Sequence, residues 1–187
     1  MVTTLAGKGV RYVIGLDESN HGLVPEIYVA ALTTNLDLLI KQSLGKKHKK
    51  PRDLEYFLKD LDDFRFVVLE EKHFKKFGPC SIKAPAIGLL INSFFGQLVP
   101  LQTQIIIDGS PSPGLHNDLV SILSTGYNAS IDRRQIHFAV EADIKYPIVN
   151  RADAIAYRLK LIYEKLGSQK GPYDDKRIHF EDAILLD

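Results

Sequence analysis

Short apolar runs rich in β-branched residues alternate along this chain with stretches of helical periodicity. Apolar runs of this length, bounded by turn residues, are typical of strands. We predict five strands, over residues 11–16, 27–32, 64–69, 105–107 and 135–140. The segment between the first two contains Asn20, Gly22 and Pro25, so these two strands are expected to form a hairpin.

Apolar residues spaced three and four positions apart predict the helices. We predict helices over residues 54–61, 85–98, 117–124 and 151–166, and a short one that begins near Asp37. Pro85 favours a helix start at that point, because proline fits the first turn. The segment 72–78 fits neither pattern clearly.

The order of these elements favours an α/β fold with a central mixed β-sheet flanked by helices. The first strands are expected to be antiparallel, and a helix followed by a strand implies a right-handed crossover to a parallel strand. A chain of 187 residues fits one domain over residues 1–187. Residues 167–187 would be a C-terminal tail, either docked or loose.

Acidic residues stand where two of the apolar runs end. Asp17 and Glu18 follow the first run, and Asp108 follows Ile105-Ile106-Ile107. Loops at the carboxyl ends of buried strands are where α/β proteins place their chemistry. If the two strands are neighbours, the three carboxylates converge, and a divalent cation is needed to keep them ionised together.

Two further acids complete the candidate set. Asp143 follows the strand at 135–140, and Asp153 lies in the first turn of the last helix. Oxygen ligands of this kind suit Mg²⁺ or Mn²⁺, and two such ions about 4 Å apart could clamp a phosphodiester. The alternative is that these residues are turn formers or helix caps, which applies most to Asp153.

Several other classes of chemistry are disfavoured by the sequence. Cys80 is the single cysteine, which excludes an internal disulfide and a cysteine zinc cage and fits a reducing cytosol. The six histidines show no paired zinc spacing, and no phosphate-binding loop or serine-hydrolase motif is present. No stretch of about 18 apolar residues occurs, so we expect a soluble, cytoplasmic protein with no membrane partner.

Net charge does not identify a partner, because it is only +1. Any contact with nucleic acid must come from local basic patches. The lysines at 46, 47, 49 and 50 either contact phosphates or are simply solvated. Lys145 lies close in sequence to the candidate acids and could bind a backbone phosphate.

Three motifs together resemble the ribonuclease H-like superfamily, and most closely type 2 ribonuclease H. They are Ile14-Gly15-Leu16-Asp17-Glu18, Ile105-Ile106-Ile107-Asp108-Gly109 and the Ala-Asp-x-Lys-Tyr-Pro stretch at 142–147. The resemblance implies a nuclease in which Asp17, Glu18, Asp108 and Asp143 bind the metal.

The chain departs from type 2 ribonuclease H in the segment that contacts substrate. Asn20, His21 and Gly22 stand where that family has a Gly-Arg-Gly segment that reads the ribose 2′-hydroxyl. The substrate therefore remains open between RNA, RNA–DNA hybrid and DNA. The chain also resembles a related RNase H-like family with Asp-Glu-Ser and Ala-Asp-x-x-Ala motifs, at 17–19 and 152–156, which implies that Asp153 is a ligand.

We therefore expect a nuclease dependent on Mg²⁺ or Mn²⁺. Its catalytic and metal-binding residues would be Asp17, Glu18, Asp108, Asp143 and Asp153. The competing hypothesis is a catalytically silent module that keeps the sheet and binds nucleic acid or acts as a scaffold. A sugar-kinase or actin-like relative is disfavoured, because such proteins need two similar domains and a longer chain.

Overall fold

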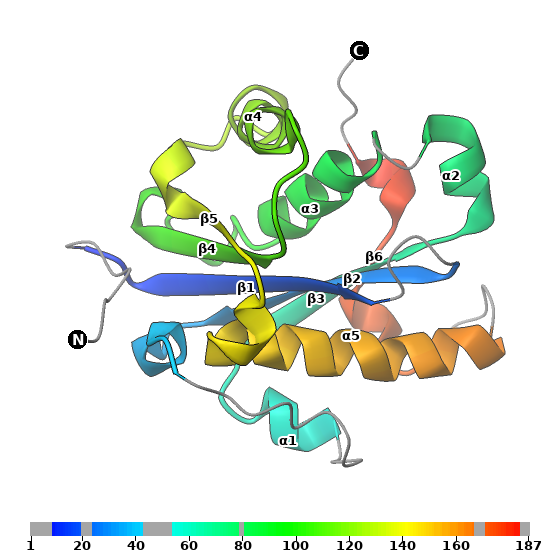
Figure 1. Cartoon of the computed structure of the whole chain (residues 1–187), viewed down its shortest axis with the longest axis horizontal. Coiled ribbons are helices and arrows are strands. Elements are labelled where there is room, and N and C mark those ends of the chain that lie inside the picture. The colour runs from blue at the N-terminus through cyan, green and yellow to red at the C-terminus, as the bar shows by residue number, and fades with distance from the viewer. Residues whose placement is uncertain (1–8, 20–23, 43–53, 79–80, 167–170, 184–187) are drawn as a thin grey trace.

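The computed structural model describes residues 9–19, 24–42, 54–78, 81–166 and 171–183. A six-stranded sheet in the order β5-β4-β1-β2-β3-β6 lies between helices on its two faces (Figure 1). The strands are β1 (Tyr12–Ser19), β2 (Glu26–Thr33), β3 (Asp63–Leu69), β4 (Thr103–Asp108), β5 (Ile136–Ala139) and β6 (Arg177–Ile178). Strand β2 is antiparallel to β1 and β3, and the pairs β1·β4, β4·β5 and β3·β6 are parallel. The predicted mixed sheet and its antiparallel start are confirmed.

Helices cover both faces of the sheet. The α-helices are α1 (Leu54–Leu58), α2 (Glu71–Phe77), α3 (Lys83–Asn92), α4 (Leu115–Ser121) and α5 (Pro147–Leu166). Shorter helical turns are η1 (Leu36–Leu39), η2 (Pro100–Gln102), η3 (Ile122–Gly126), η4 (Arg133–Gln135), η5 (Ala142–Ile144), η6 (Asp174–Lys176) and η7 (Phe180–Asp182). Helices α1 and α5 lie on one face, and α2, α3 and α4 lie on the other (Figure 1). None of the described helices has the length and hydropathy needed to cross a bilayer.

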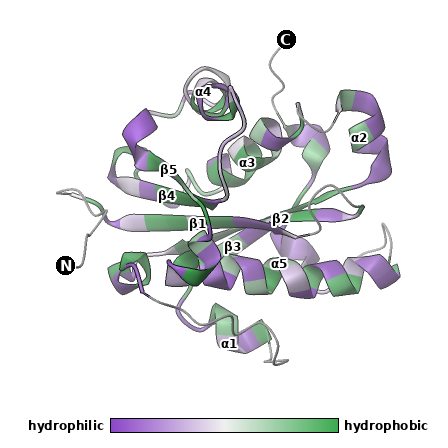
Figure 2. Cartoon of the chain, viewed as in Figure 1, coloured by the Kyte–Doolittle hydropathy of each residue, from purple (hydrophilic) through white to green (hydrophobic). Residues whose placement is uncertain are grey.

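Alternate residues of the central strands supply two separate cores. In β1, Val13 packs on the side of α5, whereas Ile14 and Leu16 pack on the side of α3. A strand buried on both faces is apolar at consecutive positions, which explains the continuous runs in the sequence. Figure 2 shows the middle of β1, strand β4 and helix α3 as mostly hydrophobic, while α5 alternates hydrophobic and hydrophilic residues.

All four longer predicted helices have different bounds in the structure: α1 ends at Leu58 rather than at 61, and α4 covers Leu115–Ser121 rather than 117–124. Helix α3 ends at Asn92 although apolar residues continue to Leu98, because the Ser93 hydroxyl donates to the carbonyl of Leu90 and competes with the helical pattern. Helix α5 begins at Pro147, four residues before the predicted start. The segment 72–78 is resolved as helix α2, which opens with a reciprocal capping box between Glu70 and His73.

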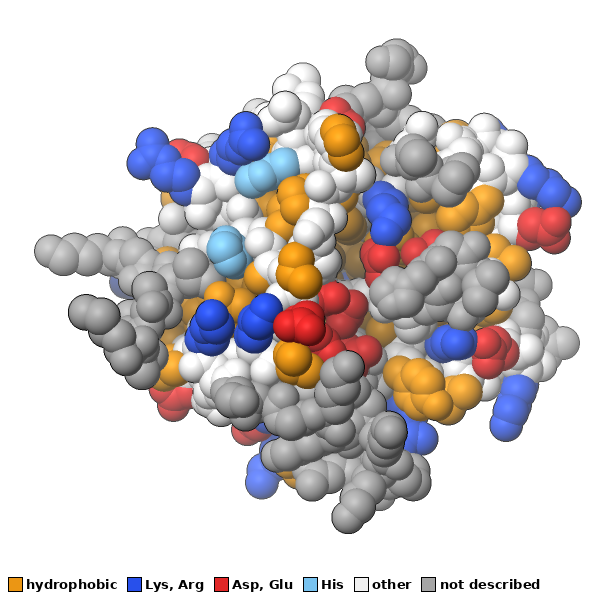
Figure 3. Space-filling model, in the orientation of Figure 1, with side chains coloured by type: hydrophobic (Ala, Val, Ile, Leu, Met, Phe, Trp, Pro, Cys, Tyr) orange, Lys and Arg blue, Asp and Glu red, His pale blue; other side chains and the backbone are white. Residues whose placement is uncertain are grey.

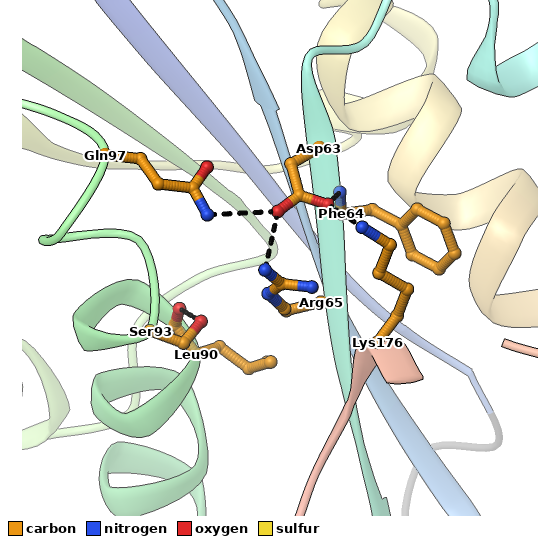
Figure 4. Close-up of polar contacts among 7 residues, drawn as sticks. All are labelled: Asp63, Phe64, Arg65, Leu90, Ser93, Gln97 and Lys176. Carbon is orange, nitrogen blue, oxygen red and sulfur yellow. Dashed lines mark hydrogen bonds and ion pairs between the residues drawn. The ribbon is translucent and has the colours of Figure 1, made fainter. Parts of the chain in front are cut away.

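The part of the C-terminal segment that the structure describes is docked. Strand β6 pairs with β3, and the buried Phe180 ring packs edge-on against His73 and Phe77. Figure 4 shows a second anchor, in which Lys176 donates to Asp63 at 2.7 Å. Asp63 also pairs with Arg65 at 2.8 Å and accepts from Gln97 at 3.3 Å. These contacts fix residues 171–183 along the β3 edge of the sheet.

Candidate active site

Asp17 and Asp108 occupy adjacent positions on neighbouring parallel strands. Leu16 of β1 is in register with Ile107 of β4, so the next residue on each strand is an aspartate. Neighbouring strands lie about 4.8 Å apart. Both side chains point to the face covered by α5, because the residue two positions earlier on β4, Ile106, packs on that side. The structure therefore brings these two predicted acids together.

Helix α5 adds Asp153 to this face through a close contact with β1. A Cβ atom on Gly15 would lie 2.8 Å from the carbonyl carbon of Ile148, so the helix rests directly on the strand there. Helix and strand then run in the same direction (Figure 1). Asp153 is five helical residues further on, about 7.5 Å, and Asp17 is two strand residues further on, about 6.6 Å. The two residues therefore lie at similar distances beyond this contact, in the same direction.

Asp143 reaches the same place from the end of β5. The turn η5 follows that strand after two residues, and the Ala142 N–H donates to the Asp108 carboxylate. This hydrogen bond ties η5 to the carboxyl end of β4. Asp143 thus comes next to Asp108. Burial is the main cause of the raised pKa of both Asp108 and Asp17, and the negative charge of Asp143 adds to it.

The electrostatics of the cluster are unfavourable without a cation. Asp17 is only 8% exposed, and its pKa is raised well above the usual range by burial and then by the charges of Asp153, Asp108 and Asp143. A 2.7 Å hydrogen bond from the Glu18 N–H opposes this rise. Burial also raises the pKa of Asp108. Like charges at such separations repel strongly, so a bound cation would stabilise the ionised forms.

Glu18 points to the opposite face of the sheet. Strand β1 continues to Ser19, so successive side chains still alternate at the acidic pair. The Glu18 carboxylate pairs with Lys83 of α3 at 2.7 Å and faces Tyr28, its partner in register on β2. The Tyr28 hydroxyl donates to the buried Glu26, and burial followed by the charges of Glu18 and Glu26 raises the pKa of Tyr28. The predicted convergence of Glu18 with Asp17 and Asp108 is therefore not what the structure shows.

Comparison with solved structures identifies the fold. The crystal structure of ribonuclease H2 from Pyrococcus horikoshii OT3 superposes with a TM-score of 0.56 at 21% identity, covering 87% of this chain and 82% of that chain. The chain has a ribonuclease H2-like fold. The crystal structure of Bst-RNase HIII in complex with Mn²⁺ gives a TM-score of 0.53 at 18% identity, covering 87% of this chain and 58% of that one. No protein-family model and no curated protein matches the sequence.

The predicted substrate-contacting residues fall into two groups within this ribonuclease H2-like fold. Lys145 follows η5, where its ammonium group donates to the Val140 carbonyl and pairs with Glu141 at 3.4 Å. It lies two residues after Asp143. Asn20, His21 and Gly22 lie outside the described residues.

The donor chemistry of the cluster suits Mg²⁺ or Mn²⁺, because all four aspartates offer carboxylate oxygens. Among the residues that the structure describes, no three His, Cys, Asp or Glu side chains are arranged so that they could hold a metal ion. Figure 3 shows acidic side chains gathered near the centre of one face, flanked by basic ones. The donors thus share one region but not the spacing of a closed metal cage.

Two features of the site were missed in the sequence, and one of them left a signal there. Gly15 interrupts an apolar strand, and an isolated strand glycine indicates a close backbone approach, here that of α5. The hydrogen bond from the Ala142 N–H to Asp108 could not be predicted, because a backbone donor does not depend on the type of side chain. Gly15 therefore leaves room for the close approach of α5, a role that the motifs alone did not explain.

Proposed function

We propose that this protein is a divalent-metal-dependent nuclease that hydrolyses phosphodiester bonds in RNA, RNA–DNA hybrid or DNA. The observation that carries the proposal is the gathering of Asp17, Asp108, Asp143 and Asp153 from four separate elements at one place. A fold has no structural need to place four repelling carboxylates together. The ribonuclease H2-like fold supports the same reaction class by analogy.

Each residue of the cluster has a proposed role. Asp17 and Asp108 would hold the cations, and Asp143 and Asp153 would complete the ligand set. A bound divalent cation would lower the pKa of water and stabilise the charge that develops on the phosphoryl oxygens during in-line displacement. Lys145 would bind a substrate phosphate beside Asp143.

Glu18 belongs to the proposed site as a positioning residue, with a role that differs from that of the four aspartates. Its carboxylate is on the α3 face, where it fixes Lys83 at 2.7 Å. The Lys83 side chain is 37% exposed, so its ammonium group is accessible to a phosphate at this edge of the sheet. We propose that Glu18 acts by positioning that ammonium group.

A cleavage assay tests the proposal. Labelled RNA, single-stranded DNA and RNA–DNA hybrid are incubated with the protein and Mg²⁺ or Mn²⁺, and then with excess chelator. We expect cleavage that the chelator abolishes and that falls by at least about 100-fold in Asp17→Asn and Asp108→Asn. Asp118→Asn, which changes an exposed acid on α4, is the matched control and should cleave normally. Full cleavage by Asp17→Asn would overturn the assignment.

The second candidate is a catalytically silent module that binds nucleic acid. It is favoured by the ion pair between Glu18 and Lys83, and because no three His, Cys, Asp or Glu side chains among the described residues are arranged to hold a metal ion. Metal-independent binding of the same oligonucleotides, with no cleavage in either metal, would establish this function instead.

A further inference from the structure

A band of lysine, arginine and histidine side chains leads to the acidic cluster along the edge strand β5. We define the basic band as Lys41, His116, Arg133, Arg134, His137 and Lys145. Figure 3 shows basic and histidine side chains to the left of the acidic centre, on the same face of the molecule. The band is exposed at its outer end, where the Arg134 side chain is 92% exposed.

The outer half of the band is held together by specific contacts. The His116 ring lies 3.2 Å from the carbonyl oxygen of Arg133, measured from Nε2. Arg133 also donates to Asn117 at 3.1 Å, which fixes its guanidinium beside α4. The His116 ring then packs edge-on against Phe138 of β5, with ring centroids 5.4 Å apart.

The inner half joins β5 to the acidic cluster. His137 packs edge-on against Tyr146, and burial lowers the pKa of His137, which disfavours the charged form of this ring. Lys145 precedes Tyr146, and its carbonyl accepts a 2.7 Å hydrogen bond from the Gln42 N–H. That bond places the exposed Lys41 beside Lys145. The band therefore ends next to Asp143.

An exposed aromatic ring stands on the other side of the acids. Tyr157 is 47% exposed, although it belongs to a helix whose apolar face is buried. It follows Asp153 by four residues, so both side chains lie on the same face of α5, one turn or about 6 Å apart. Lys145, Asp153 and Tyr157 thus follow one another along the direction of α5.

We propose that a single-stranded nucleic acid lies across this face, with its phosphates along the basic band and a base stacked on Tyr157. The inference rests on the proposed function, because the scissile phosphate would lie at the aspartates between these two features. A positive track combined with an aromatic platform is how proteins bind unpaired strands without reading their sequence. A base paired within a duplex has no free face for the Tyr157 ring, so an unpaired nucleotide is required there.

Binding measured without cleavage tests the stacking contact. Fluorescence anisotropy is recorded with a labelled single-stranded 12-mer and with the corresponding duplex, in chelator. Tyr157→Ala should weaken single-strand binding by about tenfold or more, and Tyr157→Phe should retain it, since the ring provides the stacking. Tyr56→Ala removes a ring of similar exposure (51%) on α1 and should leave binding unchanged.

The salt dependence of binding tests the basic band. For single strands, log K falls with log salt concentration by about 0.7 for each phosphate that a protein neutralises. The double variant Lys41→Gln and Arg134→Gln should therefore reduce this slope by about 1.4. Lys75→Gln combined with Lys165→Gln removes two exposed charges outside the band and should not change the slope.

The outcomes separate this inference from the proposed function. If the Tyr157→Ala variant binds like the wild type and still shows metal-dependent cleavage, the proposed single-strand binding is overturned and the proposed nuclease function stands. If the variant loses single-strand binding and the wild type shows no cleavage, the proposed single-strand binding is supported and the proposed nuclease function is overturned. Tighter binding of duplex than of single strand would also overturn the proposed single-strand binding.

Discussion

Replacing Gly15 with alanine should separate α5 from β1 and destabilise the fold. The added Cβ would lie 2.8 Å from both the carbonyl carbon and Cγ1 of Ile148 and 2.9 Å from its oxygen. Carbon atoms in contact are normally about 3.5–4.0 Å apart, so the helix must move by roughly 1 Å. A side chain could rotate away, but the Ile148 backbone cannot.

The expected loss of stability can be estimated from two opposing effects. Overpacking of this kind costs about 1–3 kcal/mol, and the upper end applies because backbone atoms are involved. Alanine in a strand recovers about 0.5–1 kcal/mol relative to glycine. The net destabilisation is therefore about 2 kcal/mol, which lowers Tm by about 4–8 °C in a chain of this size.

Urea and thermal unfolding followed by circular dichroism measure this loss. Gly96→Ala is the matched control, since a Cβ there meets nothing within 4 Å, and it should change the free energy of unfolding by less than about 0.5 kcal/mol. Ile148→Ala should not restore the stability of Gly15→Ala, because the backbone clash remains. A Gly15→Ala protein as stable as the wild type would refute the close contact that carries Asp153 to Asp17.

Three further variants test the charges and the C-terminal segment. Asp17→Asn removes a buried, repelled charge, so its Tm in metal-free buffer should rise by roughly 2–4 °C for each kcal/mol regained; a fall in calorimetry would contradict this. Burial raises the pKa of the Asp63 carboxyl, but Lys176 and its other partners lower it by more, so the pKa lies below the usual 3.8. The ionised Asp63 carboxylate stabilises the fold above pH 3.8, and this stabilisation is lost as the pH falls through the pKa of the folded state. Asp63→Asn should therefore cost about 1–3 kcal/mol of the free energy of unfolding at pH 7. Urea titrations should show a progressively smaller cost below about pH 4. Phe180→Ala should cost about 3–5 kcal/mol in the same titrations, and a cost under 1 kcal/mol would show that the segment does not support the core.

The sheet could be predicted because its central strands are buried on both faces. β1, β2 and β4 appear in the sequence as continuous apolar runs, and the helix before β4 implied that β4 is a parallel strand, which the structure pairs with β1. β6 could not be predicted in this way. It has two residues, Arg177 and Ile178, and exists because the β3 edge offers unpaired backbone groups.

The candidate site could be predicted in part. Asp17 and Asp108 were expected to converge because both follow apolar runs, and the register places them together. Glu18 was grouped with them because the first strand was expected to end at Leu16, whereas β1 continues to Ser19 and turns Glu18 to the other face. Because side chains alternate between the two faces of β1, Glu18 lies on the other face from Asp17, although the two residues are adjacent in sequence.

Anomalous scattering from crystals soaked in Mn²⁺ tests most directly whether the four aspartates form a metal site. We predict an anomalous peak between Asp17 and Asp108, with Asp143 or Asp153 also turned toward the ion. Asp17→Asn crystals soaked in the same way should lose that peak. A peak held elsewhere on the protein, or no peak at Asp17 and Asp108 at saturating Mn²⁺, would contradict the proposed metal-dependent nuclease.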